Sequence, residues 1–335
     1  MILDFHTHVF PSEFRNVREA IFPHEPAFKL LYDSPRAKMV GATELIRTMD
    51  EEGVHRSVIF GFPWEDEARF KRHNDYVIES VQLHPGRLTG FCCFSVMAPG
   101  AAREAERCLK SGLSGVGELA VYDAGLTPEV TSAFKDVMSV CTGLDVPLML
   151  HVNEPVGHNY PGKAPITLHQ IYQFIKTYPS NRIVLAHWGG GIFFFGLLKK
   201  EVKDVLKNVW FDTAASPYIY SPDVYRIAGQ IIGFDKILFG SDYPLLRPKR
   251  YFDEMTAAGL AGDAMAMMTG LNGEKVLNLK SQICTYPPIE DICPTTNFSM
   301  SRLCPLGLLE TAFKKIFRSS SSEAPFLIGP FKSSS

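Results

Sequence analysis

Eight short apolar runs, most of them followed by a helical pattern, dominate this sequence of 335 residues. The runs are rich in β-branched residues and are bounded by Gly, Pro or polar clusters, which is typical of buried strands. They cover residues 2–8, 57–62, 87–95, 113–119, 146–152, 182–188, 208–214 and 236–242. A strand that is apolar along its whole length needs cover on both faces, so these runs predict a parallel sheet between layers of helices.

Amphipathic helical patterns lie between the runs. In residues 43–53, Leu45, Ile46 and Met49 share one face and Gly53 provides a C-terminal stop. Similar patterns cover residues 73–84, 101–112, 128–142, 167–178 and 222–232, and residues 271–279 predict a closing helix. Eight alternating units are the number that closes a (β/α)8 TIM barrel, and we predict this α/β fold for residues 1–280. The alternative is an open doubly wound sheet, but no GxGxxG turn follows the first run.

The pattern changes after residue 280. Residues 281–335 are turn-rich and aperiodic and end in serine runs, which predicts a largely disordered C-terminal extension. Within it, residues 306–319 place Leu308, Phe313 and Ile316 on one helical face. This short amphipathic helix is expected to dock on the barrel, with binding to a membrane surface or a partner as the alternative.

Composition excludes several classes of function. The formal net charge is −2 and the basic residues are scattered, so no surface for nucleic acid is expected. No apolar stretch reaches the ~18 residues that a transmembrane segment needs. The first run starts at residue 2, which argues against a signal peptide, and the seven cysteines form no CxxC pair. We therefore expect a cytoplasmic protein with reduced thiols whose partner is a small molecule, and homo-oligomerisation stays open.

Polar side chains recur where the runs end. His6 and His8 are two residues apart on one strand, so both point to the same side, which is inward in a barrel. Four later runs offer Glu118, His151, His187 and Asp242 near their carboxyl ends. Each group alone has a structural explanation, such as a hydrogen-bonded histidine or a capping aspartate. All six at matching strand ends predict a site for one or two divalent ions, with zinc as the first choice, at the barrel mouth.

Four motifs then resemble a known family. The segments "DFHTH", "LHVNEP", "LAHWGGG" and "FGSDYPL" are similar to those of the metal-dependent amidohydrolase superfamily, in its amidohydrolase-related (amidohydrolase 2) branch. The resemblance implies a distorted barrel in which His6, His8, His151 and Asp242 hold the principal ion. It also implies that Asp242 shuttles protons, while His187 either binds a second ion or polarises the substrate. Glu118 stands where many two-metal members carry a carbamylated lysine, so the number of ions stays open.

Two reactions fit this branch, which contains both hydrolases and non-oxidative decarboxylases. The first expectation is a metal-dependent hydrolase that activates water, with Asp242 and His187 as catalytic residues. The alternative is a single-metal decarboxylase of an aromatic or unsaturated acid. A bridging Glu118 would favour the hydrolase, whereas a Glu118 that points into the wall would favour the decarboxylase. A third reading is a barrel that keeps the site without catalysis.

Loops after the strands suggest a substrate. They bring aromatic and basic side chains to the expected mouth, and these predicted substrate-binding residues are Trp64, Arg69, His158, Tyr160, Lys163, Tyr218 and Arg247. Aromatic walls with a cation suit a cyclic or aromatic carboxylate, lactone or amide, although any one of these side chains could simply pack on the rim. Residues 9–42 form a long connection that is a candidate lid.

Overall fold

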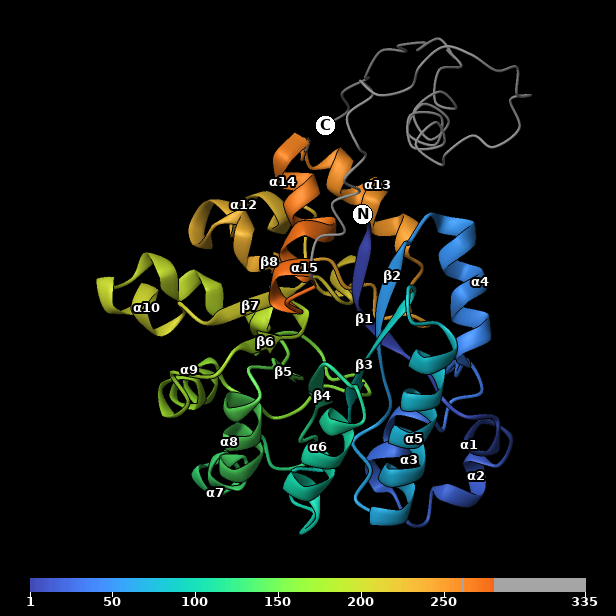
Figure 1. The fold of residues 1–335 in the computed structure, drawn as a ribbon. Helices are drawn as coiled ribbons and strands as arrows, with labels where there is room; N and C mark the ends of the chain where they lie inside the picture. Colours follow the sequence, from blue (N-terminus) through green and yellow to red (C-terminus); the bar gives the residue numbers. More distant parts are fainter. Residues whose placement is uncertain (261, 280–335) are drawn as a thin grey trace, which may run out of the picture. The chain divides into compact units, whose positions relative to one another are not determined.

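A computed structural model describes residues 1–260 and 262–279 (Figure 1). Eight parallel strands form one sheet in the order β1 to β8, with neighbours in sequence also neighbours in space. The strands are β1 (Leu3–His8), β2 (Arg56–Phe60), β3 (Leu88–Cys92), β4 (Gly115–Leu119), β5 (Leu148–Leu150), β6 (Ile183–Leu185), β7 (Val209–Asp212) and β8 (Ile237–Leu238). Each strand lies inside one of the eight predicted runs or within one residue of it.

Backbone hydrogen bonds join the last strand segment to the first. The Phe5 N–H donates to the Phe239 carbonyl oxygen (2.7 Å), the His8 N–H to that of Tyr243 (2.8 Å), and the Asp242 N–H to that of His6 (3.0 Å). The sheet therefore closes on itself, and the prediction of a TIM barrel is confirmed over an open doubly wound sheet.

Helices cover the outside of the barrel (Figure 1). They are α4 (Ala42–Glu52), α5 (Glu67–Leu83), α6 (Ala101–Lys110), α7 (Pro128–Ala133), α8 (Lys135–Gly143), α9 (Leu168–Thr177), α10 (Lys200–Val205), α11 (Ser216–Ile219), α12 (Val224–Ile232), α13 (Pro248–Ala257), α14 (Gly262–Ala266) and α15 (Asn272–Val276). Local chemistry explains their ends: Gly53 stops α4 with φ 73°, and Thr167 with Gln170 forms a capping box at the start of α9. The predicted helix 128–142 is two helices, α7 and α8.

Three further helical elements complete the layer. They are the 3-10 helices η1 (His187–Leu197) and η2 (Phe234–Lys236) and the π-helix η3 (Met267–Leu271). The closing helix predicted for residues 271–279 is η3 followed by α15. Residues 281–335, with the amphipathic helix predicted at 306–319, lie outside the described residues. None of the helices described within residues 1–279 has the length and apolar character to cross a membrane.

The connection between β1 and α4 is not an open loop. It contains α1 (Ser12–Asn16), α2 (Arg18–Ile21) and α3 (Pro26–Tyr32), so the candidate lid over residues 9–42 is partly helical. Phe28 of α3 is fully buried and packs on Phe62 and Trp64, with ring centroids 5.3 and 4.6 Å away. The segment is therefore held by an aromatic core beneath it.

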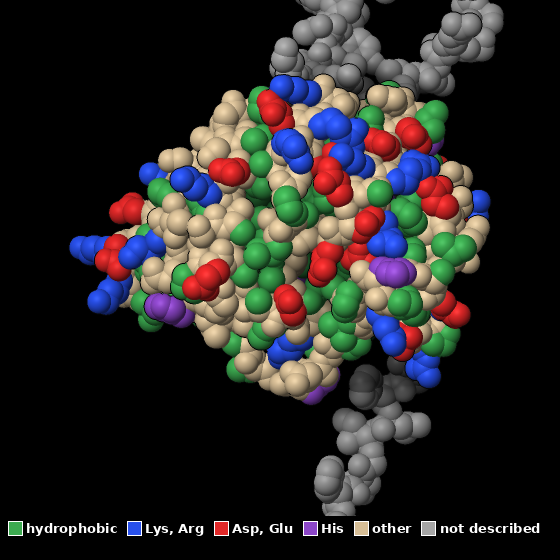
Figure 2. Space-filling model, turned by 90° about the horizontal axis from the view of Figure 1, so that it is seen from below, with side chains coloured by type: hydrophobic (Ala, Val, Ile, Leu, Met, Phe, Trp, Pro, Cys, Tyr) green, Lys and Arg blue, Asp and Glu red, His purple; other side chains and the backbone are tan. Residues whose placement is uncertain are grey.

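The same segment is also held by a buried carboxylate. Glu25 is 1% exposed and accepts hydrogen bonds from the backbone N–H groups of Glu65 and Asp66, both at 3.1 Å. β1 runs from the N-terminus toward the end of the barrel where α1, α2 and α3 lie (Figure 1). Figure 2 views the molecule from that end and shows hydrophobic side chains gathered near the middle of the face, with Asp and Glu side chains among them.

A buried histidine supports this end of the barrel. His73 of α5 is fully buried, and its Nε2 donates to the Val9 carbonyl oxygen (2.6 Å) while its Nδ1 accepts from the Trp64 indole N–H (2.8 Å). Burial lowers the pKa of His73 from 6.5 to about 3. The ring is therefore neutral in the folded protein, with the proton on Nε2.

We predict that His73 makes the fold acid-sensitive between about pH 6.5 and pH 3, because in this range His73 binds a proton in the unfolded chain and does not bind one in the folded chain. The stability that the neutral ring contributes is present above pH 6.5 and falls by about 3 kcal/mol on going from pH 7 to pH 4. Urea unfolding of wild type and His73→Gln at both pH values measures it. The variant should be less stable at pH 7 and lose less on acidification. Equal pH dependence in the two proteins would contradict the prediction, and exposed His24→Gln is the control.

Candidate metal centre

Backbone conformation brings six side chains from five strand ends to one place. His187 and Asp242, which follow β6 and β8, have positive φ angles of 53° and 60°, an uncommon conformation for such residues. In β4, Gly117 has φ 129°, and a Cβ there would lie 2.4 Å from the Met149 carbonyl oxygen. Only glycine fits at this position, where the β4–β5 register shifts, and the next side chain, Glu118, joins the cluster inside the mouth.

The two histidines of β1 meet two carboxylates. His6 Nε2 lies 3.3 Å from His8 Nε2, 3.5 Å from Glu118 Oε2 and 3.6 Å from Asp242 Oδ1. His8 Nε2 lies 3.3 Å from the same Asp242 oxygen and 3.8 Å from Glu118 Oε2. Four of the six predicted residues therefore share one small volume.

The other two histidines lie near the second carboxylate oxygen of Glu118, Oε1. His151 Nδ1 is 2.9 Å and His187 Nε2 is 3.5 Å from Glu118 Oε1. Three groups that could hold an ion overlap here: His6 with His8 and Glu118, His6 with His187 and Asp242, and Glu118 with His151 and His187. Within each group the ligand atoms lie within 4.8 Å of one another. The six side chains chosen from the sequence are thus brought together.

Each histidine uses its outer nitrogen to contact a protein oxygen. His6 Nδ1 lies 2.8 Å from Asp212 Oδ2, His151 Nε2 lies 2.8 Å from the Gly162 carbonyl, and His187 Nδ1 lies 3.1 Å from the Ala214 carbonyl. Because those oxygens accept, the outer nitrogens donate, and the inner nitrogens, which face the carboxylates, carry either a lone pair or a proton. A lone pair facing a carboxylate needs a proton or a cation between them. This is the orientation that imidazole ligands of a metal require.

The cluster lacks a basic partner. In the described part of the chain, Glu118, Asp212 and Asp242 form ion pairs with histidines and with no Lys or Arg. Burial opposes ionisation of Asp242, but its hydrogen bond with His8 and the charges of His6 and His187 lower its pKa to about 2. Burial likewise opposes charge on His187, but Glu118 outweighs it and raises the pKa to about 9. The carboxylates therefore draw positive charge into the site, which protons or a divalent ion can provide.

Asp212 is a central residue that the sequence analysis missed. It is fully buried at the end of β7, and besides His6 it accepts from the backbone N–H groups of His187 (2.9 Å) and Ala214 (3.0 Å). One carboxylate thus orients residues from β1 and from the turn after β6. The rule that selected the other strand ends applies equally to Asp212 in "NVWFDTA".

Two predicted substrate-binding residues support the fold instead. Trp64 has no exposed surface and donates its indole N–H to His73, so it lies in the core and not at the mouth. Arg69 is 3.3 Å from Glu25 Oε1 and helps to anchor the β1–α4 segment. An aromatic or basic residue in a strand-end loop therefore need not bind a ligand: Trp64 is a buried core residue, and Arg69 is paired with a carboxylate.

The loop after β5 forms an internal network. Lys163 Nζ donates to Glu154 Oε1 (3.0 Å), and the Tyr160 hydroxyl donates to Glu154 Oε2 (2.9 Å). The His158 ring packs edge-on against that of Tyr160, with centroids 6.3 Å apart. Lys163 and Tyr160 are therefore already paired within the loop.

The remaining two predicted residues face outward. Tyr218 is 61% exposed, and the Arg250 guanidinium lies 5.2 Å from its ring centroid. Arg247 pairs with Glu51 and Glu52 of α4, and its side chain is 55% exposed. The three predicted cations of the mouth, Arg69, Lys163 and Arg247, thus all have carboxylate partners.

Aromatic residues that the sequence analysis passed over lie beside the cluster. Tyr122, just after β4, packs on His151 with centroids 5.2 Å apart and stacks on Phe62 at 6.4 Å. Tyr32, the last residue of α3, packs edge-on against Phe62 at 6.1 Å. No local pattern marks these residues, because their proximity follows from the folding of the β1–α4 segment onto the β2 and β4 loops.

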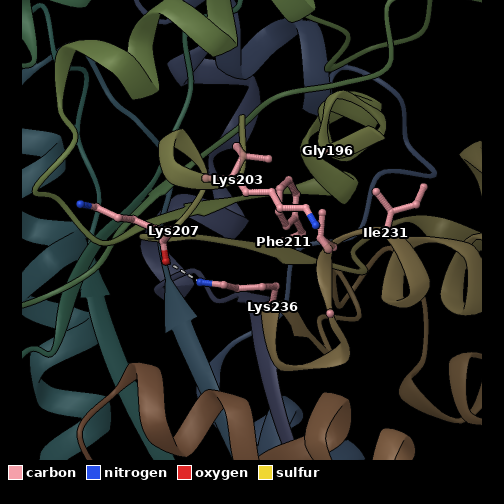
Figure 3. A pocket seen from close by; sticks show the side chains of 9 residues that line it. Gly196, Lys203, Lys207, Phe211, Ile231 and Lys236 are labelled. Atoms are coloured by element: carbon pink, nitrogen blue, oxygen red, sulfur yellow. Dashed lines mark hydrogen bonds between the residues drawn. The ribbon is translucent and has the colours of Figure 1, made fainter. Parts of the chain in front are cut away.

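A separate pocket of about 300 Å³ lies between α10 and α12 against the outside of β7 (Figure 3). Phe211, Leu206 and Ile231 line it together with Lys203 and Lys236. The Lys236 ammonium donates to the Lys207 carbonyl oxygen and lies 4.6 Å from the Trp210 ring centroid. None of the metal-ligand candidates lines this pocket, so it is distinct from the mouth.

A closed (β/α)8 barrel whose strand ends converge on imidazoles and carboxylates defines the class of barrel enzymes with a metal centre at the mouth. Residues 3–279 match the amidohydrolase family. The chain belongs to this family, as the resemblance of its motifs predicted.

Two curated relatives are similar along most of their length. The chain is 25% identical to a γ-resorcylate decarboxylase from Polaromonas sp. over 249 residues, which are 59% of this chain and 76% of the relative. It is 24% identical to a 2-keto-4-carboxy-3-hexenedioate hydratase from Sphingobium sp. over 300 residues, 72% of this chain and 83% of the relative.

Solved structures share the fold. The 5-carboxyvanillate decarboxylase from Sphingomonas paucimobilis superposes with a TM-score of 0.67 at 19% identity, covering 83% of this chain and 99% of that one. A manganese-bound dihydroxybenzoic acid decarboxylase from Polaromonas sp. superposes with a TM-score of 0.62 at 20% identity, covering 83% and 97%. At this level of identity the superpositions establish the barrel and no more.

We predict that Asp212→Asn weakens metal binding about 10- to 100-fold, because the amide no longer enforces the His6 tautomer that leaves Nε2 free. Titration of the metal-free protein with Mn²⁺ or Zn²⁺ by calorimetry measures the change. Asp204→Asn removes an exposed carboxylate on α10 and serves as the matched control. An affinity of Asp212→Asn equal to that of the control would refute the role of Asp212.

Proposed function

We propose that this protein is a metal-dependent, non-oxidative decarboxylase of an aromatic or unsaturated carboxylic acid. The observation that carries the proposal is that the ligand cluster lies beside an aromatic wall, Phe62 and Tyr122, in a chain similar to enzymes named for decarboxylating aromatic acids. The hydrolase expected first from the sequence becomes the second candidate.

A divalent ion fits the residues present. The buried carboxylates have no Lys or Arg partner among the described residues, and the inner nitrogens of His6, His151 and His187 face them. His6, His8, His151 and Asp242 would hold the ion, with Glu118 within reach. Imidazole and carboxylate ligands accept zinc as well as manganese, the ion named for a structure of similar fold. Such an ion would act as a Lewis acid for oxygen atoms of the substrate.

Residues of the chain itself would supply the proton that the reaction consumes. In decarboxylation the C–C bond breaks, CO₂ leaves, and the electron pair stays on the carbon, which must then take up a proton. With a pKa of about 9, His187 holds a proton at pH 7, whereas Asp242, with a pKa of about 2, is ionised. His187 is therefore the donor: its proton goes to the carbon that CO₂ leaves, and water then reprotonates His187, so one proton is consumed for each carboxylate converted, while Asp242 stays ionised.

A two-metal hydrolase is supported by one specific observation. Glu118 directs Oε2 toward His6 and His8 and Oε1 toward His151 and His187, which is the arrangement of a carboxylate shared between two positions. Glu118 faces the four histidines and, among residues 1–260 and 262–279, forms no ion pair with an arginine. The count of bound ions separates this candidate from the decarboxylase.

The decarboxylase proposal predicts CO₂ release from hydroxylated aromatic acids. We expect the manganese- or zinc-loaded protein to convert 2,6-dihydroxybenzoate or 5-carboxyvanillate, measured as CO₂ release and loss of substrate absorbance. His187→Asn should lower kcat about 100-fold or more, because the proton donor is lost. His169→Asn changes an exposed histidine on α9 and should leave the rate unchanged. Turnover of esters or lactones with no CO₂ release from any acid would reject the proposal in favour of the hydrolase.

The same proposal predicts one tightly bound ion per chain. Elemental analysis of protein purified without chelators, on wild type and Glu118→Gln, tests this. One ion in both proteins agrees with the decarboxylase. Two ions in wild type falling to one in the variant would support the bridged hydrolase.

A further inference from the structure

Two tyrosine hydroxyls beside the cluster lack a protein partner. Within residues 1–260 and 262–279, neither the Tyr32 nor the Tyr122 hydroxyl forms a hydrogen bond, although both side chains are only partly exposed. Neither oxygen is among the fully buried side-chain atoms found without a partner, and both residues keep some exposed surface. Side chains deep in the protein with accessible, unpaired hydroxyls are free to bind a ligand.

The two hydroxyls lie near the open side of the cluster. The His8 and Asp242 side chains are 18% and 13% exposed, whereas His6 has no exposed surface, so a ligand approaches past His8 and Asp242. Burial raises the pKa of Tyr32, and the charges of Asp242 and Glu118 raise it further. Burial, Glu118 and Tyr32 raise the pKa of Tyr122 in the same way. Ring packing places them here: Tyr122 lies 5.2 Å from the His151 ring, and both tyrosines pack on the ring of Phe62, so both phenols lie beside the cluster, and both stay protonated as donors.

Ring packing holds the phenols in place. Tyr122 is stacked on Phe62 at an interplanar angle of 13°, and Tyr32 meets the same ring at 74°. Tyr32 is also packed on Phe28 and Phe10 of the anchored β1–α4 segment. The donors are therefore positioned before any ligand binds, which lowers the entropy lost on binding.

We propose that Tyr32 and Tyr122 form a two-donor subsite for a second oxygen substituent of the substrate, a ring hydroxyl or a second carboxylate. The predicted cations Arg69, Lys163 and Arg247 are all paired with carboxylates, so these neutral donors take the role expected of a cation. The substrate class is then an aromatic acid with at least one further oxygen group, in preference to an unsubstituted benzoate. This inference rests on the proposed function, since it assumes that the substrate carboxylate lies at the metal cluster.

The test compares binding of 2,6-dihydroxybenzoate and benzoate to the metal-loaded full-length protein by calorimetry. Wild type should bind 2,6-dihydroxybenzoate at least tenfold more tightly than benzoate. Tyr32→Phe and Tyr122→Phe keep the rings and remove only the hydroxyls, and each should reduce this preference about tenfold with benzoate affinity unchanged. Tyr172→Phe, on the outer helix α9, is the matched control. Metal content and thermal unfolding of the variants establish that the site and fold persist.

The outcomes separate the subsite from the reaction. A preference that survives in both Phe variants, or a wild type that binds both acids equally or neither, overturns the subsite even where CO₂ release is observed. A preference that disappears in the variants while wild type releases no CO₂ supports the subsite and refutes the decarboxylase.

Discussion

The structure depends on one electrostatic constraint: three carboxylates, Glu118, Asp212 and Asp242, are held inside the barrel mouth with imidazoles as their ion-pair partners. Ionised groups removed from water are strongly unfavourable without opposite charge nearby. Asp212 meets this need through His6 and two backbone N–H groups, whereas Glu118 and Asp242 face the inner nitrogens of several histidines. The site is thus built to accept positive charge, and its chemistry follows from what provides that charge.

Closure of the barrel brings these groups together. His6 and Asp242 are more than 230 residues apart in the sequence, yet the Asp242 N–H donates to the His6 carbonyl oxygen, so the last segment is aligned on the first strand. The left-handed backbone at His187 and Asp242 then directs these two side chains into the mouth, whereas an extended backbone would point them elsewhere. Backbone strain at these two positions is therefore concentrated at the site.

The helical segment between β1 and α4 connects the core to the proposed subsite of Tyr32 and Tyr122. Glu25 and Phe28 tie this segment to the β2–α5 loop, and α3 ends in Tyr32 beside the cluster. Trp64 and Arg69 thereby contribute to the site indirectly, by supporting the segment that carries a donor. An aromatic or basic residue in a strand-end loop is poor evidence for ligand contact, because the same residue types also stabilise the loop itself.

The sequence by itself determined the eight strands, the parallel barrel and the six metal-ligand candidates, because strand periodicity and chain order decide which face and which end of the sheet a residue occupies. The same rule also selects Asp212, at the end of the seventh strand. Only the tertiary structure decided which side chains between the strands lie beside the cluster: Tyr122 packs on His151 and Tyr32 on Phe62, whereas Trp64 is in the core and Tyr218 and Arg247 are exposed. Loop side chains have no fixed period, and their direction is set by contacts with residues distant in the chain, such as His73 for Trp64 and Glu51 for Arg247.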